Sequence, residues 1–144
     1  MVCEPWEKKL NPITNYDARF SLPFAVALML INGKAGLAEF SEENAAAPQI
    51  RTLMAKVRYA VDATYQVKDM SGWIEVTLKD GTRYTSSIPE VRGNAQNPIA
   101  WEELLDKFNA NTSFLGAARS SRIANGVREL PMLSNIDEFM RLLT

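Results

Sequence analysis

The stretch Trp73-Ile74-Glu75-Val76-Thr77-Leu78-Lys79-Asp80-Gly81-Thr82-Arg83-Tyr84-Thr85-Ser86-Ser87 decides the fold class of this 144-residue chain. Its two halves are β-prone runs on either side of Asp80-Gly81. This dipeptide is typical of a tight two-residue hairpin, because both turn positions require positive φ. Ile74, Val76 and Leu78 alternate with polar residues, so we expect them to face a core. The sequence therefore predicts an antiparallel hairpin with one apolar face.

A strongly apolar helix is predicted before the hairpin, from about Leu22 to Ile31. Ser21 is a candidate N-cap, Pro23 suits the first turn, and Gly33 follows the last turn as a stop signal. The helix is apolar on every side, and a short helix of this kind is buried on all faces. We therefore expect it to be a central element of the core.

The segments around this helix carry weaker signals. The chain through Pro12 has no helical period, and we expect it to be extended or loop. A helix is predicted from Pro48 to about Lys56, and a turn of helix is expected around Phe40. A further strand is predicted where three β-prone residues alternate, at Val57, Tyr59 and Val61.

Three helices are predicted after Asn97-Pro98. The apolar face of the first consists of Trp101, Leu104, Leu105 and Phe108. The second is marked by Ile123, Val127 and Leu130 and is stopped by Pro131. The third is expected to be capped by Ser134, with Asp137 three residues on and an apolar face of Ile136, Phe139, Met140 and Leu143.

This order of elements predicts an α+β fold: a small antiparallel sheet with covering helices, followed by C-terminal helices. A sheet of two or three strands needs further packing to be stable. The amphipathic C-terminal helices are expected either to cover that sheet or to pack on something that this chain does not contain.

Composition excludes several classes of function. Hydrophobic residues make up 47% and charged residues 23% of the chain, which is typical of a globular protein. The formal net charge is −1 and the basic residues are scattered, so we expect no nucleic-acid partner. No apolar run is long enough for a transmembrane helix, and the first residues do not resemble a signal peptide. We therefore expect a cytoplasmic protein without a membrane partner.

The chain contains no histidine and one cysteine, Cys3. A Ser-His-Asp or Cys-His arrangement is therefore impossible within it, and the commonest general base is absent. Cys3 alone makes no thiolate metal cage, and we expect it to be a free structural cysteine. The acidic residues Glu39, Glu42 and Glu43 are expected to lie in a solvated loop rather than a metal site. We expect no catalytic residue, metal or cofactor site in this chain.

Several segments resemble the MmgE/PrpD family, which includes 2-methylcitrate dehydratases and cis-aconitate decarboxylases. The best of them, Pro12-Ile13-Thr14-Asn15-Tyr16-Asp17-Ala18-Arg19-Phe20-Ser21-Leu22-Pro23-Phe24, is similar to the family pattern P-x-T-x-Y-[DE]-A-[KR]-F-S-x-[PQ]-[YF]. Further similarities follow in the family's order, at residues 48–57, 76–81, 92–93, 97–98 and 102–108. Together they span nearly the whole chain.

The resemblance implies that the chain is a C-terminal part of a longer enzyme. Residues 1–96 would form most of an α+β lid domain, and residues 97–144 would pack on a helical domain that this chain lacks. The family's catalytic histidine, acidic and lysine residues lie upstream of this segment. The implied partners are a small tri- or dicarboxylate substrate and the missing helical domain or a partner chain, with a homodimer expected for the full-length protein.

The resemblance also implies three substrate-binding residues. Arg19 matches a Lys or Arg position and could pair with a substrate carboxylate, whereas its alternative is an ion pair with Asp17. Phe24 occupies a position where some relatives have a substrate-facing tyrosine, and its alternative is core packing. Tyr16 could be a wall or proton donor of the site. Ser21 is expected to be a helix cap rather than a nucleophile.

Two classes of function remain open from the sequence. In the first, the chain is the lid part of a lyase that removes a proton beside a carboxylate and releases water or carbon dioxide. In the second, it is a non-catalytic binding or interaction module left by truncation. A third alternative, a degraded product, predicts exposed apolar surface and aggregation. We expect the isolated chain to be inactive in each case.

Overall fold

The computed structural model describes residues 2–64 and 71–144. These residues form two compact units, Met1–Val61 and Asp62–Thr144. Helices accompany one two-stranded antiparallel sheet, so the predicted α+β class is confirmed. The domain boundary expected between residues 96 and 97 concerns a longer protein and stays a prediction. No helix in the described part of the chain has the length and hydrophobicity required to cross a membrane.

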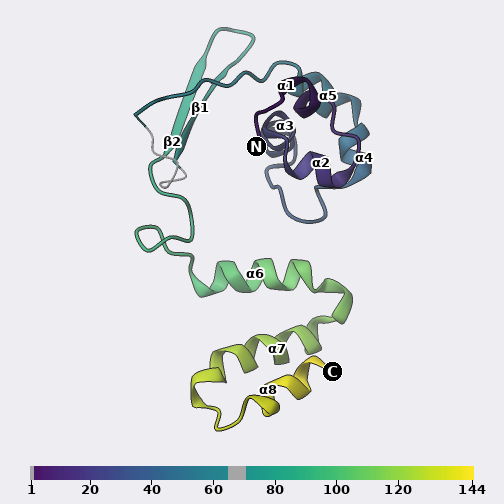
Figure 1. Cartoon of the computed structure of the whole chain (residues 1–144), viewed down its shortest axis with the longest axis vertical. Coiled ribbons are helices and arrows are strands. Elements are labelled where there is room, and N and C mark those ends of the chain that lie inside the picture. Colours follow the sequence, from purple (N-terminus) through teal and green to yellow (C-terminus); the bar gives the residue numbers. More distant parts are fainter. Residues whose placement is uncertain (1, 65–70) are drawn as a thin grey trace. The chain divides into compact units, whose positions relative to one another are not determined.

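The first unit contains five helices in its described residues (Figure 1). They are α1 (Trp6–Leu10), α2 (Asn15–Arg19), α3 (Leu22–Asn32), α4 (Glu42–Ala46) and α5 (Pro48–Met54). The longest of them, α3, packs against α1, α2 and α5. The core consists of buried side chains from four of these helices: Ala18, Phe24, Ala27, Leu28, Ala45, Ile50 and Met54.

The boundaries of α3 follow the sequence signals. The Ser21 hydroxyl accepts a hydrogen bond from the Phe24 amide at 3.1 Å, and Gly33 ends the helix with a φ of 68°. Ser21 is itself buried, and its hydroxyl donates to the Lys9 carbonyl at 2.6 Å. The N-cap therefore also joins the start of α3 to the end of α1. Both predictions, the cap and the stop, are confirmed.

The expectation that α3 is buried on every side is wrong within this unit. Phe24, Ala27 and Leu28 are fully buried. Met29, Leu30 and Ile31 in the last turn are 40–49% exposed. The short neighbouring helices cover the N-terminal half of α3 and leave its C-terminal turn without a cover.

Two predictions in this unit are wrong for local reasons. The segment before Pro12 is not wholly extended, because the Pro5 carbonyl accepts hydrogen bonds from the amides of Lys8 and Lys9 and starts α1. Residues 57–61 form no strand, and no strand in the described part of the chain pairs with them. The Tyr59 ring instead packs on Trp6, with 5.1 Å between ring centroids.

The second unit begins with the hairpin of β1 (Gly72–Thr77) and β2 (Arg83–Ile88). The predicted hairpin is confirmed, but its loop has three residues rather than two. The Gly81 amide donates to the Leu78 carbonyl, the Leu78 amide donates to the Thr82 carbonyl, and Gly81 has a φ of 87°. This pattern is a turn followed by a glycine bulge.

The apolar face of the hairpin is largely exposed within this unit. Ile74 is 37% exposed and Leu78 is 44% exposed, so the prediction that they face a core is wrong for the chain alone. The register places Val76 opposite Tyr84, which is 60% exposed. Apolar and polar residues alternate along β1 as predicted, but the described residues of this unit do not bury the apolar face.

The C-terminal helices are α6 (Trp101–Asn111), α7 (Ala117–Glu129) and α8 (Ile136–Leu143), and α7 packs against both others. The α7–α8 contact is close at Gly126, where an added Cβ would lie 2.6 Å from Leu142 Cδ1. The cap of α8 is Asn135 rather than the predicted Ser134, since the Asn135 side chain accepts from the Asp137 amide.

We expect Ser21→Ala to lower the free energy of unfolding of the first unit by about 2 kcal/mol. The substitution removes a helix cap and leaves the partly buried Lys9 carbonyl without its donor. Urea denaturation followed by circular dichroism measures the change. Ser134→Ala is the control, because Ser134 is exposed and does not cap α8. Equal stability of the Ser21→Ala variant and the original chain would show that the cap contributes nothing.

Candidate functional site

Two of the three predicted site residues, Tyr16 and Arg19, are exposed, and both lie on α2. Tyr16 is 65% exposed and its ring lies against Phe20, with centroids 5.0 Å apart. Arg19 is also exposed and follows Tyr16 by three residues, so both lie on neighbouring positions of the helix surface. The helix therefore presents a phenol and a guanidinium beside each other.

A capping box fixes the start of α2. Asp17 accepts hydrogen bonds from the Thr14 amide at 3.1 Å and from the Thr14 hydroxyl at 2.9 Å, while its own amide donates to that hydroxyl. The bonds from the Thr14 hydroxyl and then the Thr14 amide lower the pKa of Asp17 below its usual value of 3.8. The Asp17 carboxylate is therefore engaged in the cap.

The alternative for Arg19, an ion pair with Asp17, does not occur. Among the ion pairs found in residues 2–64 and 71–144, none includes Arg19. An exposed guanidinium in this setting keeps its donors for solvent or for an incoming anion. This is the chemistry that carboxylate recognition requires.

The third predicted site residue, Phe24, lies in the core. It is fully buried, and its ring packs against Phe40 with 5.7 Å between centroids. The structure thus shows the alternative role, core packing, and a substrate would reach Phe24 only after the core had opened. Tyr16 and Arg19 are brought together on α2, and Phe24 is not part of that surface.

One residue that the sequence reasoning did not single out lies behind α2. The side chain of Arg51 on α5 donates from Nε to the Ala45 carbonyl at 2.6 Å and from Nη2 to the Pro12 carbonyl at 3.1 Å. Its only sequence signal is a cation within the largely apolar helix Pro48–Met54, which could equally have been a solvated position.

Acidic residues form no metal site in the described ranges. Among residues 2–64 and 71–144, no group of three or more His, Cys, Asp or Glu side chains is placed to hold a metal ion. Glu39 is mostly covered rather than solvated, since it binds the Lys34 ammonium and the Gly36 amide, each at 2.9 Å. The hydrogen bond from Lys34 and then that from Gly36 hold the pKa of Glu39 below its usual value.

An ion pair fixes the start of α6. Arg92 binds the Glu103 carboxylate and donates to the Asn97 side chain at 2.9 Å. The bond from Arg92, followed by that from the Ala100 amide, lowers the pKa of Glu103. Arg92 thus holds the turn that precedes α6. Arg92 therefore has partners in the chain, whereas none of the ion pairs among residues 2–64 and 71–144 includes Arg19.

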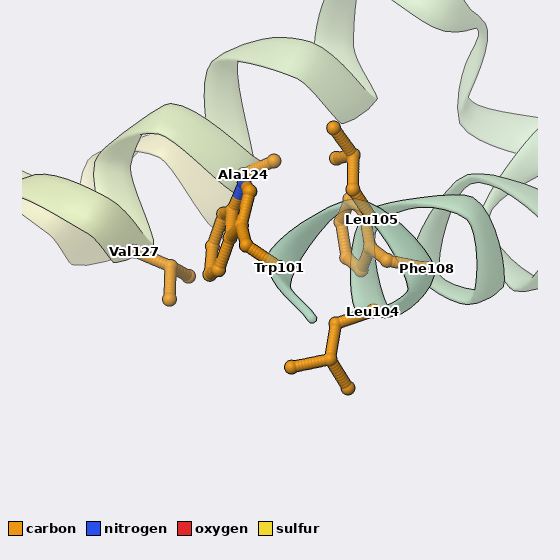
Figure 2. A pocket seen from close by; sticks show the side chains of 6 residues that line it. All are labelled: Trp101, Leu104, Leu105, Phe108, Ala124 and Val127. Carbon is orange, nitrogen blue, oxygen red and sulfur yellow. The ribbon is translucent and has the colours of Figure 1, made fainter. Parts of the chain in front are cut away.

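A second candidate surface is an apolar groove between α6 and α7, which we call the Trp101 groove (Figure 2). Its volume is 170 Å³, and it is lined by Trp101, Leu104, Leu105, Phe108, Ala124 and Val127. Arg128 lies over the Trp101 ring, 5.1 Å from its centroid. The lining offers no polar group to orient a carboxylate, so the groove suits apolar side chains rather than a citrate-like molecule.

Comparisons with known proteins extend these observations. Residues 2–130 match the family model described as the MmgE/PrpD C-terminal domain. Cis-aconitate decarboxylase of Homo sapiens is 33% identical over 104 residues, which cover 71% of this chain and 22% of that protein. The Mus musculus protein of the same name is 30% identical over 104 residues, with 71% and 21% covered.

A more distant relative covers more of the chain. Cis-aconitate decarboxylase of Aspergillus terreus is 24% identical over 144 residues, which cover 96% of this chain and 29% of that protein. The chain therefore spans less than a third of the length of each of these curated relatives.

We expect the Asp17 carboxyl to titrate below 3.8, and Thr14→Ala to raise its pKa toward that value. Because the folded-state pKa is lowered, the carboxylate stabilises α2 above the unfolded pKa. That contribution is lost as the pH falls through the folded pKa. Carboxyl chemical shifts measured by NMR over an acid titration, for the original chain and for Thr14→Ala, give both values. A normal Asp17 pKa would contradict the observed capping box.

Proposed function

The chain belongs to the MmgE/PrpD family, and we propose that it forms the C-terminal lid portion of a cytoplasmic lyase that acts on a small citrate-like carboxylate. The reaction would be proton abstraction beside a carboxylate with loss of water, or loss of carbon dioxide with protonation of the carbanion that is left. The observation that carries this proposal is the exposed pair of Tyr16 and Arg19 on α2, within the segment that resembles the family most closely.

In this proposal Arg19 is the primary substrate contact. A guanidinium binds a carboxylate with two parallel hydrogen bonds, and a citrate-like molecule offers three carboxylates. Tyr16 would form a wall beside it and could donate a hydrogen bond through its hydroxyl. Closure of this surface over the substrate would exclude water from the reacting carbon.

The residue that removes the proton would come from outside this chain. The sequence has no histidine, and neither Tyr16 nor Arg19 is a suitable base near neutral pH. We therefore propose that the chain alone does not turn over substrate and that the catalytic set resides in a helical domain, supplied by the same protein or by a partner chain.

We propose two reactions to test, in order of preference. The named relatives favour decarboxylation of cis-aconitate as the first reaction to test. Dehydration of 2-methylcitrate is the second; it removes a proton next to a carboxylate together with hydroxide, whereas decarboxylation breaks a carbon–carbon bond and adds a proton to the carbanion that is left. Both substrates present the same carboxylate chemistry to Arg19, so this surface does not discriminate between them.

The apolar surfaces of the chain support the proposed helical partner. The Trp101 groove, the last turn of α3 and the open face of the hairpin are all partly exposed. Apolar surfaces of this kind mark places where another protein surface packs. We propose that the Trp101 groove receives apolar side chains from the helical domain, and that the full-length protein is a homodimer.

The alternative function is a non-catalytic binding module. The same groove supports it, because an apolar groove without polar groups is suited to a partner helix and not to a charged metabolite. In this alternative Arg19 would be an ordinary surface cation. Carboxylate binding that depends on Arg19 distinguishes the two functions.

We expect the chain to bind cis-aconitate at low salt and Arg19→Ala to weaken that binding about tenfold, since a charged hydrogen-bonded pair is lost. Arg19→Lys should be intermediate, because an ammonium keeps the charge without the two-donor geometry. Arg58→Ala is the matched control, since Arg58 is exposed and its hydrogen bonds within the described residues are to carbonyls of its own segment. Isothermal titration calorimetry measures the dissociation constants.

Turnover is the second readout of this prediction. The chain alone should not convert cis-aconitate or 2-methylcitrate, whereas coexpression with the preceding helical region should give Arg19-dependent activity. Turnover by the chain alone would overturn the assignment of the base to another domain. The binding module would be favoured if the folded chain binds no carboxylate and shows no activity either alone or when coexpressed with the helical region.

We expect Leu104→Asp to weaken assembly with the helical region about tenfold or more, because the groove would then bury an unpaired carboxylate. Leu104 is 44% exposed in the chain alone, so the change should leave the fold intact. Glu102→Asp, on the exposed side of α6, is the control. Co-purification and circular dichroism report assembly and folding separately. Unchanged assembly of the Leu104→Asp variant would exclude the groove as the contact surface.

A further inference from the structure

Arg51 connects three segments of the first unit through backbone carbonyls. It is partly buried on α5, and its guanidinium reaches the Ala45 carbonyl at the end of α4 and the Pro12 carbonyl before α2. The second of these acceptors lies 39 residues away in sequence. No carboxylate is paired with Arg51 in the described ranges, so its hydrogen-bonding capacity is directed at the backbone.

The Pro12 carbonyl lies two residues before Thr14, the N-cap of α2. Pro12 is buried, so packing restricts the movement of the chain around its carbonyl. A displacement at Pro12 is transmitted directly to the capping box, because only Ile13 separates the two residues. The bond from Arg51 therefore acts at the start of the segment that carries Tyr16 and Arg19.

α2 depends on such external contacts. It has only five residues, and helices of this length do not form on their own in water. The capping box fixes its local shape but not its place on the unit. Ala18 is its single buried residue, and this small side chain supplies little packing. α2 also contacts α3 and α4, and the guanidinium of Arg51 adds a connection from α5 to Pro12, just before the cap of α2.

An arginine is suited to this role because its donors form a rigid planar fork. Nε and Nη2 point to two acceptors from different segments at the same time, which a lysine ammonium cannot reproduce in the same geometry. The two bonds hold Pro12 at a fixed position relative to Ala45.

We propose that Arg51 is a positioning residue for the carboxylate-binding surface of α2, acting through the Pro12 carbonyl on the placement of Tyr16 and Arg19. The identity of the ligand rests on the proposed function, whereas the placement of α2 does not. Arg51 touches neither Tyr16 nor Arg19 in the described contacts and is not expected to bind the substrate itself.

The first test is amide hydrogen exchange of Arg51→Met. The amides of Ala18 and Phe20, which donate within α2, should exchange about tenfold faster, because a lost hydrogen bond loosens the segment. The Ala25 amide in α3 should keep its rate. Arg58→Met is the matched control, since the Arg58 guanidinium also binds two carbonyls, and within the described residues both belong to its own segment.

The second test is a double-mutant cycle with cis-aconitate as the probe. Arg51→Met should weaken binding about fivefold in the original chain and clearly less in the Arg19→Ala background, because the Arg19 contact that it positions is then absent. Arg51→Lys should restore part of the affinity. A purely structural role would weaken binding equally in both backgrounds.

The two tests separate the possible failures. If Arg19→Ala leaves binding unchanged, or if the chain binds no cis-aconitate, the proposed function is wrong and the exchange rates still decide the role of Arg51. If Arg51→Met speeds all amides alike, or leaves the α2 amides unchanged, the positioning role is wrong. Should Arg51→Met not fold, the same comparison made with Arg51→Lys gives the decision.

Discussion

The first unit depends on the burial of one helix that is apolar on all sides. Complete burial of a large apolar side chain contributes about 1.5–3 kcal/mol, and α3 places Phe24 and Leu28 entirely out of water. Four shorter helices are arranged around it, each too short to be stable alone. Their positions, including that of α2 with its candidate site, are consequences of covering α3. The cover stops before Met29, Leu30 and Ile31, which remain accessible to another surface.

The parts of the fold that the sequence predicted are those controlled by neighbouring residues. Ser21 and Gly33 mark the ends of α3 because a cap and a left-handed stop act within one turn of the helix. The strand expected at residues 57–61 failed because alternation predicts a strand only where a second strand is available for pairing. Likewise, Ser134 and Asn135 both precede α8, and both are residue types that cap helices. The sequence alone did not show that Asn135 would supply the cap.

The candidate site was predictable to a smaller extent. Tyr16 and Arg19 were found through family resemblance, and their exposure on α2 agrees with a surface that meets a ligand. Phe24 shares the same sequence segment but turns inward, which a linear motif does not reveal. Arg51 was missed because its partner Pro12 is distant in sequence and accepts through a carbonyl, a group that every residue possesses. The apolar residues of α6 were predicted, but their partial exposure in a groove depends on how α7 crosses them.

The length of the hairpin loop also determines which side chains share a face. Pairing of Thr77 with Arg83 places Tyr84 opposite Val76 and Ile88 opposite Gly72, so all the apolar residues of β2 join the apolar side of β1. Where the turn keeps its three residues, removing one residue from this segment shifts the pairing by one position and moves Tyr84 and Ile88 to the side of Glu75. Insertions and deletions at Lys79-Asp80-Gly81 are therefore not neutral changes in a surface turn. Among homologous sequences, this loop should vary in composition far more readily than in length.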